Sequence, residues 1–417
     1  MQRRPYSFEL AAERSLTPLH DRLVLDAIYK HQNPARCDTA KYLVHSLAHR
    51  HNGFGSTLHV LSAILGVAMQ NNRILIVAQD LKRCQANDVT FESTGSRRWA
   101  WSDARFCPAP DGARGLACLF NSSSRCLAYV NDHRDQIVEV NDYRPTTLNS
   151  HHPFVTSRRV CDGAQCGSQY SRPERLAPGP FKSQREYSLT FGRGWHVARP
   201  AACRRNGTMA PARPLHLVPL TRPPSKKGKW RAGWWRTLAI EHLLRPRDHV
   251  VRWLREQADA FWGARGGVPA NLISVHVRWG DLAAEEMGIV PVTAYVQAVR
   301  WLAASRGLRA DGRLELIVTT EDPAALAAFR AAAPAVWRLH VYEYERHATL
   351  GEAGGERSIG STSLLQLFLA LEARLFVCTT GSNWCRLINE LRKTRLDRSA
   401  GCGGNCTLFA DLCYGEW

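Results

Sequence analysis

The stretch that decides the fold is Leu272-Ile-Ser-Val-His276-Val-Arg278-Trp-Gly-Asp281. Its apolar first half predicts a buried strand. Three polar residues, His276, Arg278 and Asp281, come where that strand should end. A short apolar run followed at once by charged side chains is typical of a strand that delivers functional groups to the edge of a sheet.

The sequence after this stretch alternates between helical and strand patterns. Helices are expected over 292–306, 323–329, 363–372 and 382–393, and strands over 314–320, 337–342 and 375–379. Such alternation predicts an α/β fold with a parallel, Rossmann-like sheet.

Polar clusters follow three of the expected strands, and ligands of such sheets bind beyond the carboxyl ends of the strands. The clusters are His276, Arg278 and Asp281; Thr319, Thr320, Glu321 and Asp322; and Thr379, Thr380, Gly381, Ser382 and Asn383. An arginine beside a hydroxyl-rich helix N-terminus suits an anion, and a nucleotide diphosphate is the natural ligand. Because the sequence contains no Asp-x-Asp, we expect arginine and helix dipoles, without a metal, to neutralise the pyrophosphate.

The N-terminal half holds a second α/β pattern. Asn52-Gly53-Phe54-Gly55-Ser56 is a glycine loop, followed by a helical pattern and by an apolar strand over 73–78. Glycines let the backbone approach a ligand, although an ordinary turn is an equal alternative. We expect an irregular segment over 1–40, an α/β domain with long Cys-rich loops over 41–255, and a nucleotide-sugar-binding domain with a Cys-rich tail over 256–417.

The chain is basic, with 55 Lys and Arg against 37 Asp and Glu and a formal charge of +18. Only eight of these are Lys, and the basic residues are scattered except in 222–231, which resembles a solvated loop. The charge favours an anionic partner but does not indicate nucleic acid. No apolar run of 18 residues is present, and no signal pattern follows Met1, so we expect membrane association only through an N-terminal anchor outside this sequence.

Thirteen cysteines favour disulfides in an oxidising compartment. Two pairs lie close in sequence, Cys107/Cys118 and Cys161/Cys166, and three more crowd the end, at Cys402, Cys406 and Cys413. Zinc is the competing interpretation of the last group, which lacks a fourth ligand at zinc-finger spacing. Glycosylation sequons begin at Asn121, Asn206 and Asn405 and also indicate a glycoprotein of the secretory pathway.

These motifs resemble the alpha-1,6-fucosyltransferase family and the related rhizobial nodulation fucosyltransferases. His276-Val-Arg278-Trp-Gly-Asp281, with Glu286 and Tyr295 following, resembles their His-x-Arg-x-x-Asp motif. Thr320-Glu-Asp-Pro323 resembles their Thr-Asp-Asp-Pro. The segment 375–386 resembles their Val-Cys-Thr segment, and Gly53-Phe54-Gly55 resembles their first glycine turn. The match spans about residues 45–80 and 230–395.

The resemblance implies two Rossmann-like domains of GT-B type and an inverting, metal-independent transfer of fucose from GDP-fucose to a glycan hydroxyl, in the Golgi lumen. It implies that Arg278 holds the β-phosphate, that Glu286 is the general base and that Asp281 supports it. The implied donor-binding residues are His276, Gly53, Phe54, Gly55, Glu321, Asp322, Ser382 and Tyr295.

Three departures from the family pattern weaken the donor site. Trp279 replaces a second arginine, Leu282 replaces a lysine, and Gln366 falls where an acidic residue should read guanine. They favour the alternative of a non-catalytic relative that binds a glycan or GDP-sugar.

Several of the implied site residues also have a structural alternative. Arg278 can be an ion-pair partner and His276 a core histidine. Glu321, Asp322 and Ser382 can be helix N-caps. Glu285 is a rival to Glu286 as the base.

Overall fold

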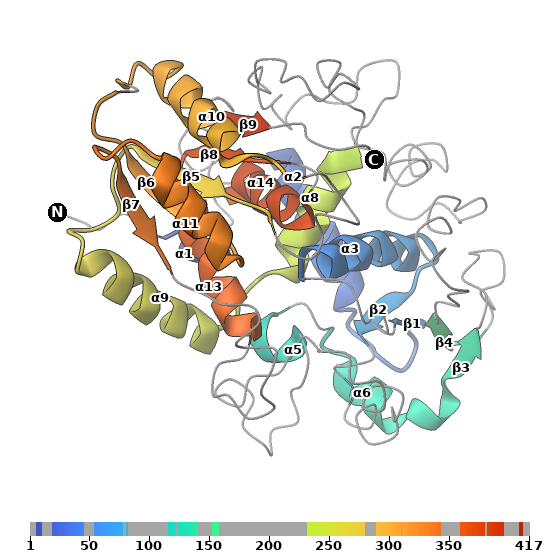
Figure 1. Cartoon of the computed structure of the whole chain (residues 1–417). Helices are drawn as coiled ribbons and strands as arrows, with labels where there is room; N and C mark the ends of the chain where they lie inside the picture. The colour runs from blue at the N-terminus through green and yellow to red at the C-terminus, as the bar shows by residue number, and fades with distance from the viewer. Residues whose placement is uncertain are drawn as a thin grey trace. The chain divides into compact units, whose positions relative to one another are not determined.

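The computed structural model describes residues 6–10, 19–45, 54–77, 81, 116–121, 124–140, 152–157, 232–279, 289–309, 311–342, 359–379, 382–395 and 408–411. Contacts divide the chain into two compact units, each with its own parallel sheet. The N-terminal unit holds the elements from α2 to α8, and the C-terminal unit holds α1 and everything from Asp248 onward. The expectation of an α/β chain with two Rossmann-like units is confirmed (Figure 1).

The N-terminal unit is built on the sheet β2-β1-β4-β3, whose strands all run parallel. Helix α8 contacts both α2 and α3 in this unit, while α5 and α6 are short. The helix and strand expected after the glycine loop are confirmed as α3 and β2. The strands are β1 (Tyr42–His45), β2 (Ile74–Val77), β3 (Val138–Val140) and β4 (Phe154–Ser157); the helices are α2 (Leu19–Gln32), α3 (Phe54–Gln70), α5 (Leu116–Leu119), α6 (Leu127–Asp132) and α8 (Ala232–Leu243).

A buried arginine and a disulfide hold this unit together. The Arg73 side chain is 1% exposed, and its Nη1 donates to the carbonyls of Tyr42, His152 and Pro153 at 3.1, 3.0 and 3.4 Å. These carbonyls lie at the amino ends of β1 and β4, so one guanidinium joins two strands. The Cys37–Cys126 disulfide, with a Cα–Cα distance of 5.4 Å, contributes to the core.

The C-terminal unit is built on the sheet β7-β6-β5-β8-β9, again entirely parallel. The expected helices and strands of this region are confirmed within a few residues at each end. The strands are β5 (Leu272–His276), β6 (Glu315–Thr319), β7 (Arg338–Val341), β8 (Leu375–Cys378) and β9 (Leu408–Asp411); the helices are α9 (Asp248–Gly263), α10 (Val292–Ala304), α11 (Pro323–Ala332), α13 (Ile359–Leu371) and α14 (Asn383–Arg395).

Side chains alternate between the two faces of this sheet. Ile273, Val275 and Val277 belong to one core cluster with residues of α10 and α11. His276 belongs to the alternate set of the same strand, on the face that α13 contacts. The alternation therefore directs His276, at the strand end, away from the α10 core.

Two parts of the chain differ from the sequence-based expectation. Residues 1–40 contain α2, in the N-terminal unit, and the short α1 (Ser7–Leu10), in the C-terminal unit, where α1 is anchored because Ser7 N donates to Glu372 Oε1 at 2.7 Å. The tail contains β9, which pairs with β8. These three elements were missed because they are short or weakly patterned and depend on contacts with distant residues.

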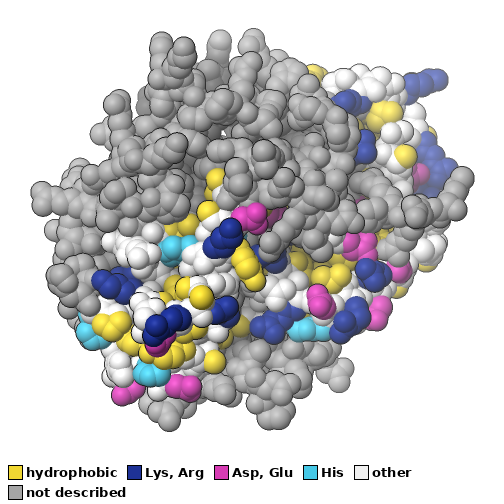
Figure 2. All heavy atoms as spheres, turned by 180° about the vertical axis from the view of Figure 1, so that it is seen from behind, with side chains coloured by type: hydrophobic (Ala, Val, Ile, Leu, Met, Phe, Trp, Pro, Cys, Tyr) yellow, Lys and Arg dark blue, Asp and Glu magenta, His cyan; other side chains and the backbone are white. Residues whose placement is uncertain are grey.

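Basic side chains do not gather into one stripe on the described surface that Figure 2 presents. There, Lys and Arg alternate with acidic, histidine and apolar side chains. Several exposed arginines pair locally with acids, as in Arg309–Asp311 and Arg313–Glu315. Such local pairing of opposite charges is typical of a solvated surface.

Candidate functional site

The strand order of the C-terminal unit creates a topological switch point. β5 is the first strand and lies at the centre; β6 and β7 extend the sheet to one side, and β8 and β9 to the other. The chain therefore reverses its direction across the sheet between β5 and β8. Ligands of such folds bind at the carboxyl ends of the strands that flank this point. Because β5 pairs in parallel with both β6 and β8, the carboxyl ends of these three strands, where the described members of the polar clusters lie, are at one edge of the sheet.

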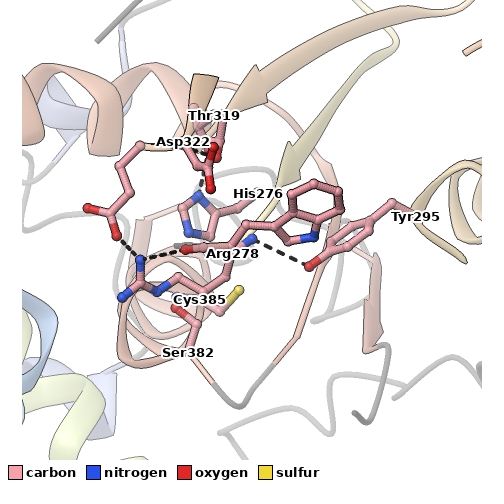
Figure 3. Close-up of polar contacts among 10 residues, drawn as sticks. His276, Arg278, Tyr295, Thr319, Asp322, Ser382 and Cys385 are labelled. Atoms are coloured by element: carbon pink, nitrogen blue, oxygen red, sulfur yellow. Dashed lines mark hydrogen bonds and ion pairs between the residues drawn. The ribbon is translucent and has the colours of Figure 1, made fainter. Parts of the chain in front are cut away.

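Arg278 lies two residues beyond β5, at the switch point, and is 7% exposed. Its guanidinium forms an ion pair with Glu321, which follows β6, and Nη1 also donates to the Trp279 carbonyl at 3.1 Å. Figure 3 draws its side chain together with Ser382 and Cys385, which come from the start of α14. The expected alternative of an ion pair is thus realised, and it holds a cation at the edge where a ligand would bind.

His276 is buried beside Arg278. Its Nδ1 shares a 3.1 Å hydrogen bond with Thr319 Oγ1, and among the described residues its Nε2 has no hydrogen-bond partner. Burial first, and the Arg278 charge second, lower the pKa of His276 to about 3. The imidazole is therefore neutral near pH 7. Its Nε2 can donate or accept a hydrogen bond, depending on the tautomer, but it presents no positive charge to a ligand.

Tyr295, on α10, is fully buried, and its hydroxyl accepts a 3.4 Å hydrogen bond from the Arg278 backbone N–H. This contact positions the backbone from which the Arg278 side chain extends (Figure 3). The resemblance implies that Tyr295 binds the donor substrate, whereas its described hydrogen bond is with the Arg278 backbone.

Asp322 begins α11 as its N-cap. Its carboxylate accepts from the backbone N–H groups of Ala324 and Ala325 at 2.8 and 3.3 Å, and Pro323 occupies the first helical turn. Glu321, 21% exposed, instead turns to Arg278. The two adjacent carboxylates thus have separate roles. Asp322 caps α11, and Glu321 forms an ion pair with the buried Arg278 guanidinium.

Ser382 stands at the start of α14. Its hydroxyl accepts from the Cys385 N–H at 3.5 Å, and its own N–H donates to the Thr379 carbonyl at 3.0 Å. A disulfide between Cys378 and Cys385, with a Cα–Cα distance of 6.2 Å, ties the end of β8 to the first turn of this helix. The helix N-terminus is therefore covalently positioned at the switch point. The sequence analysis did not identify this pair, although the strand-end and helix-start positions of its members signal it.

Two of the departures from the family pattern have structural roles. The Trp279 indole N–H donates to the Val290 carbonyl at 2.9 Å, and the ring packs against the α10 core. The Gln366 amide, buried on α13, donates to the Tyr342 carbonyl at 3.2 Å. Neither side chain brings a charge to the site.

Several expected site residues lie outside the described residues: Asp281, Glu286, Gly53, the rival base Glu285 and Leu282. The expected cysteine pairs 107/118 and 161/166 and the cysteines of the tail also lie outside the described residues. Of Cys118 only the backbone is described. Phe54 and Gly55 begin α3 in the N-terminal unit, where both are buried and the Phe54 ring lies 6.4 Å from that of Phe120.

Searches for metal sites and membrane helices found neither within the described ranges. No group of three or more His, Cys, Asp or Glu there could hold a metal ion. No described helix is long and apolar enough to cross a bilayer.

Comparison with known proteins found similar folds only among solved structures. No family model and no curated protein matches the chain. A mutant of Arabidopsis thaliana FUT1 in complex with GDP has a TM-score of 0.42 and 10% identity, covering 90% of this chain and 78% of that one. Fucosyltransferase NodZ from Bradyrhizobium has a TM-score of 0.34 and 14% identity, covering 84% and 93%. POFUT1 in complex with GDP-fucose has a TM-score of 0.36 and 10% identity, covering 89% and 98%.

Because identities of 10% and 14% say nothing about individual site residues, the capacity of the site follows from the strands and side chains of this chain alone. The switch point between β5 and β8 brings together a buried guanidinium, a neutral histidine whose buried Nε2 has no hydrogen-bond partner among the described residues, and a capped helix N-terminus. A guanidinium and a helix N-terminus are groups that can hold an anion.

Proposed function

We propose that this chain is a glycosyltransferase that moves fucose from GDP-fucose to a hydroxyl of a glycan or glycoconjugate, with inversion and without a metal. The observation that carries the proposal is the buried Arg278 guanidinium at the β5–β8 switch point, in the motif His276-x-Arg278. A nucleoside diphosphate is the anion that this fold type binds at that edge.

The donor half of the reaction needs stabilisation of the departing GDP. Negative charge accumulates on the β-phosphate as its bond to the sugar breaks, and Arg278 would donate hydrogen bonds to that group. The backbone N–H groups at the start of α14 add partial positive charge from the other side of the switch point. A guanidinium and a helix N-terminus would thus supply the electrostatic stabilisation that a divalent ion provides in other transferases.

The acceptor half needs a base, because a sugar hydroxyl becomes a strong nucleophile only as its proton is removed. His276 does not suit this role, since a pKa of about 3 leaves it a weak base. We assign the role to Glu286, supported by Asp281, from their place in the motif. Attack on the face opposite to GDP inverts the anomeric centre.

A second candidate function, binding of a GDP-sugar without transfer, is favoured by two contacts. Trp279, in the place of a second arginine, uses its indole N–H on the Val290 carbonyl. Gln366, in the place of a guanine-reading acid, uses its amide on the Tyr342 carbonyl. A donor site with one arginine and no acidic guanine contact is weaker than the family pattern implies.

We place the protein in the lumen of the secretory pathway, in the Golgi. Both described disulfides, one in each unit, suit an oxidising compartment. Asn121 of the first sequon is exposed at the surface of the N-terminal unit, as a glycosylation site must be.

Calorimetric titration with GDP, GDP-fucose, GDP-mannose and a UDP-sugar, each with and without EDTA, tests the donor. We expect binding of the GDP ligands, with GDP-fucose preferred to GDP-mannose, unchanged by EDTA. Failure of every GDP ligand to bind would refute the proposal.

Turnover separates the two candidate functions. With GDP-fucose and a panel of glycan acceptors, Glu286→Gln should lower kcat by at least about 100-fold with little change in donor affinity. Glu285→Gln is the matched control and should keep most activity. Donor binding without turnover on any acceptor would favour the non-catalytic candidate.

A further inference from the structure

The ion pair at the switch point leaves little net charge for an incoming diphosphate. Arg278 is 7% exposed and Glu321 21%, so the pair is largely withdrawn from water. The neighbouring Asp322 is directed to the N–H groups of α11. His276 contributes no charge, because its pKa of about 3 keeps it neutral. The cation that would bind the ligand is therefore already balanced by a carboxylate.

We propose that Glu321 is a specificity-determining residue that favours a nucleotide sugar over the free nucleoside diphosphate. This inference rests on the proposed function. A nucleotide sugar carries two negative charges, because its second phosphate is bonded to the first phosphate on one side and to the sugar on the other. The free diphosphate has a terminal phosphate whose second ionisation lies near pH 6, so it carries nearly one more charge at neutral pH.

The geometry puts that extra charge where Glu321 opposes it. The terminal phosphate of the product is the group that Arg278 would hold, and Glu321 is in contact with the same guanidinium. Like charges that share one cation repel, and the repulsion grows with the charge on the ligand. The carboxylate therefore weakens binding of the product GDP more than binding of the donor, and so aids product release.

Glu321→Gln tests this role because it keeps an oxygen that can accept from Arg278 while removing the negative charge. We expect GDP to bind the variant about tenfold more tightly than the wild type, and GDP-fucose only about threefold, measured by calorimetry at neutral pH. Inhibition by GDP should become correspondingly stronger in a turnover assay.

Asp311→Asn is the matched control. It removes the same charge from an exposed pair with Arg309 in the same unit, before β6 and away from the carboxyl edge of the sheet. We expect its affinities for GDP and GDP-fucose to stay within about twofold of the wild type. Equal shifts in the two variants, or weaker GDP binding by Glu321→Gln, would overturn the inference.

Inorganic pyrophosphate separates this inference from the proposed function, because it requires the anion site but no nucleoside site. Tighter pyrophosphate binding by Glu321→Gln supports the role of Glu321 even if no GDP ligand binds, an outcome that refutes the proposed function alone. GDP binding with unchanged selectivity refutes the inference alone. Absence of binding of all three ligands to both proteins refutes both.

Discussion

Two buried arginines, one in each unit, show how position decides what a buried cation does. Arg73 precedes β2 at the amino edge of its sheet, and three main-chain carbonyls accept from it. Arg278 follows β5 at the carboxyl edge of the other sheet, and its main partner is the carboxylate of Glu321. The carbonyls around Arg73 belong to the backbone at the strand ends and cannot move away unless the sheet unfolds. The Glu321 side chain is partly exposed, so Arg278 can bind a ligand in addition to it. The first arrangement stabilises the fold, and the second suits a binding site.

The two disulfides, one in each unit, are a second pair to compare. Their removal should cause the largest losses of unfolding free energy. Cys37 and Cys126 are 89 residues apart in sequence, and Cys378 and Cys385 only seven. From loop-closure entropy, removal of the first pair by double substitution to serine should cost about 4 to 5 kcal/mol and removal of the second about 2.5. Urea denaturation of both double variants measures the two costs. A larger loss for the Cys378→Ser/Cys385→Ser protein would show that chain entropy does not set the ranking.

Arg73→Met should cost about 3 kcal/mol of unfolding free energy, because buried carbonyls of two strands lose a charged donor. Arg36→Met is the control in the same unit, since Arg36 pairs with Asp38 at a side-chain exposure of 69%. Its cost should stay within about 0.5 kcal/mol. If the two variants unfold at the same urea concentration, Arg73 does not hold the sheet together as proposed.

Arg278→Met should mainly weaken ligand binding, whereas Arg73→Met should mainly lower stability. We expect at least about 100-fold weaker binding of GDP-fucose, equivalent to about 2.7 kcal/mol. The loss of stability should be about 1 kcal/mol, because Glu321 is 21% exposed and can be hydrated when its partner is removed. Calorimetry and urea denaturation of the same samples measure both quantities, with the exposed Arg300→Met on α10 as the control. Binding that survives in the Arg278 variant would break the comparison.

His276 should give no effect on stability near neutral pH, and its effect should become visible only in acid. In the unfolded chain this imidazole takes up a proton near pH 6.5, whereas in the folded chain its pKa is about 3. Its contribution to stability is therefore complete above pH 6.5 and falls as the pH drops, by at most about 1.4 kcal/mol per pH unit. His276→Gln should flatten this acid slope between pH 6 and 4 in urea denaturation. An unchanged slope would mean that another group causes it.

The parallel sheet of the C-terminal unit could be predicted because its strands are apolar runs that end abruptly in polar clusters. Each run carries its own signal, and the parallel order follows from the helices between them. β9 and α2 could not be predicted in this way. β9 has only four residues among cysteines, and α2 acquires its order from tertiary contacts such as the Gln32 side chain, which accepts from Leu75 N at 3.0 Å.

Three residues that the structure places at this edge of the sheet were indicated by the sequence, but their pairings were not. Sequence motifs singled out Arg278, His276 and Ser382, since each lies at or just beyond the end of an apolar strand pattern. That Glu321 binds Arg278 while Asp322 caps a helix depends on side-chain directions over two adjacent residues. The disulfide at Cys378 and the indole contact of Trp279 likewise depend on distances that a spacing pattern does not contain.

A crystal structure of the protein grown with GDP-fucose tests the central claim most directly. We expect the diphosphate between Arg278 and the first turn of α14, with the His276 Nε2 hydrogen-bonded to the nucleotide. Glu321 should remain on the guanidinium or turn away from it, without contact to a phosphate oxygen. A nucleotide bound elsewhere, with the Arg278–Glu321 pair unchanged and without contact to the ligand, would contradict the account.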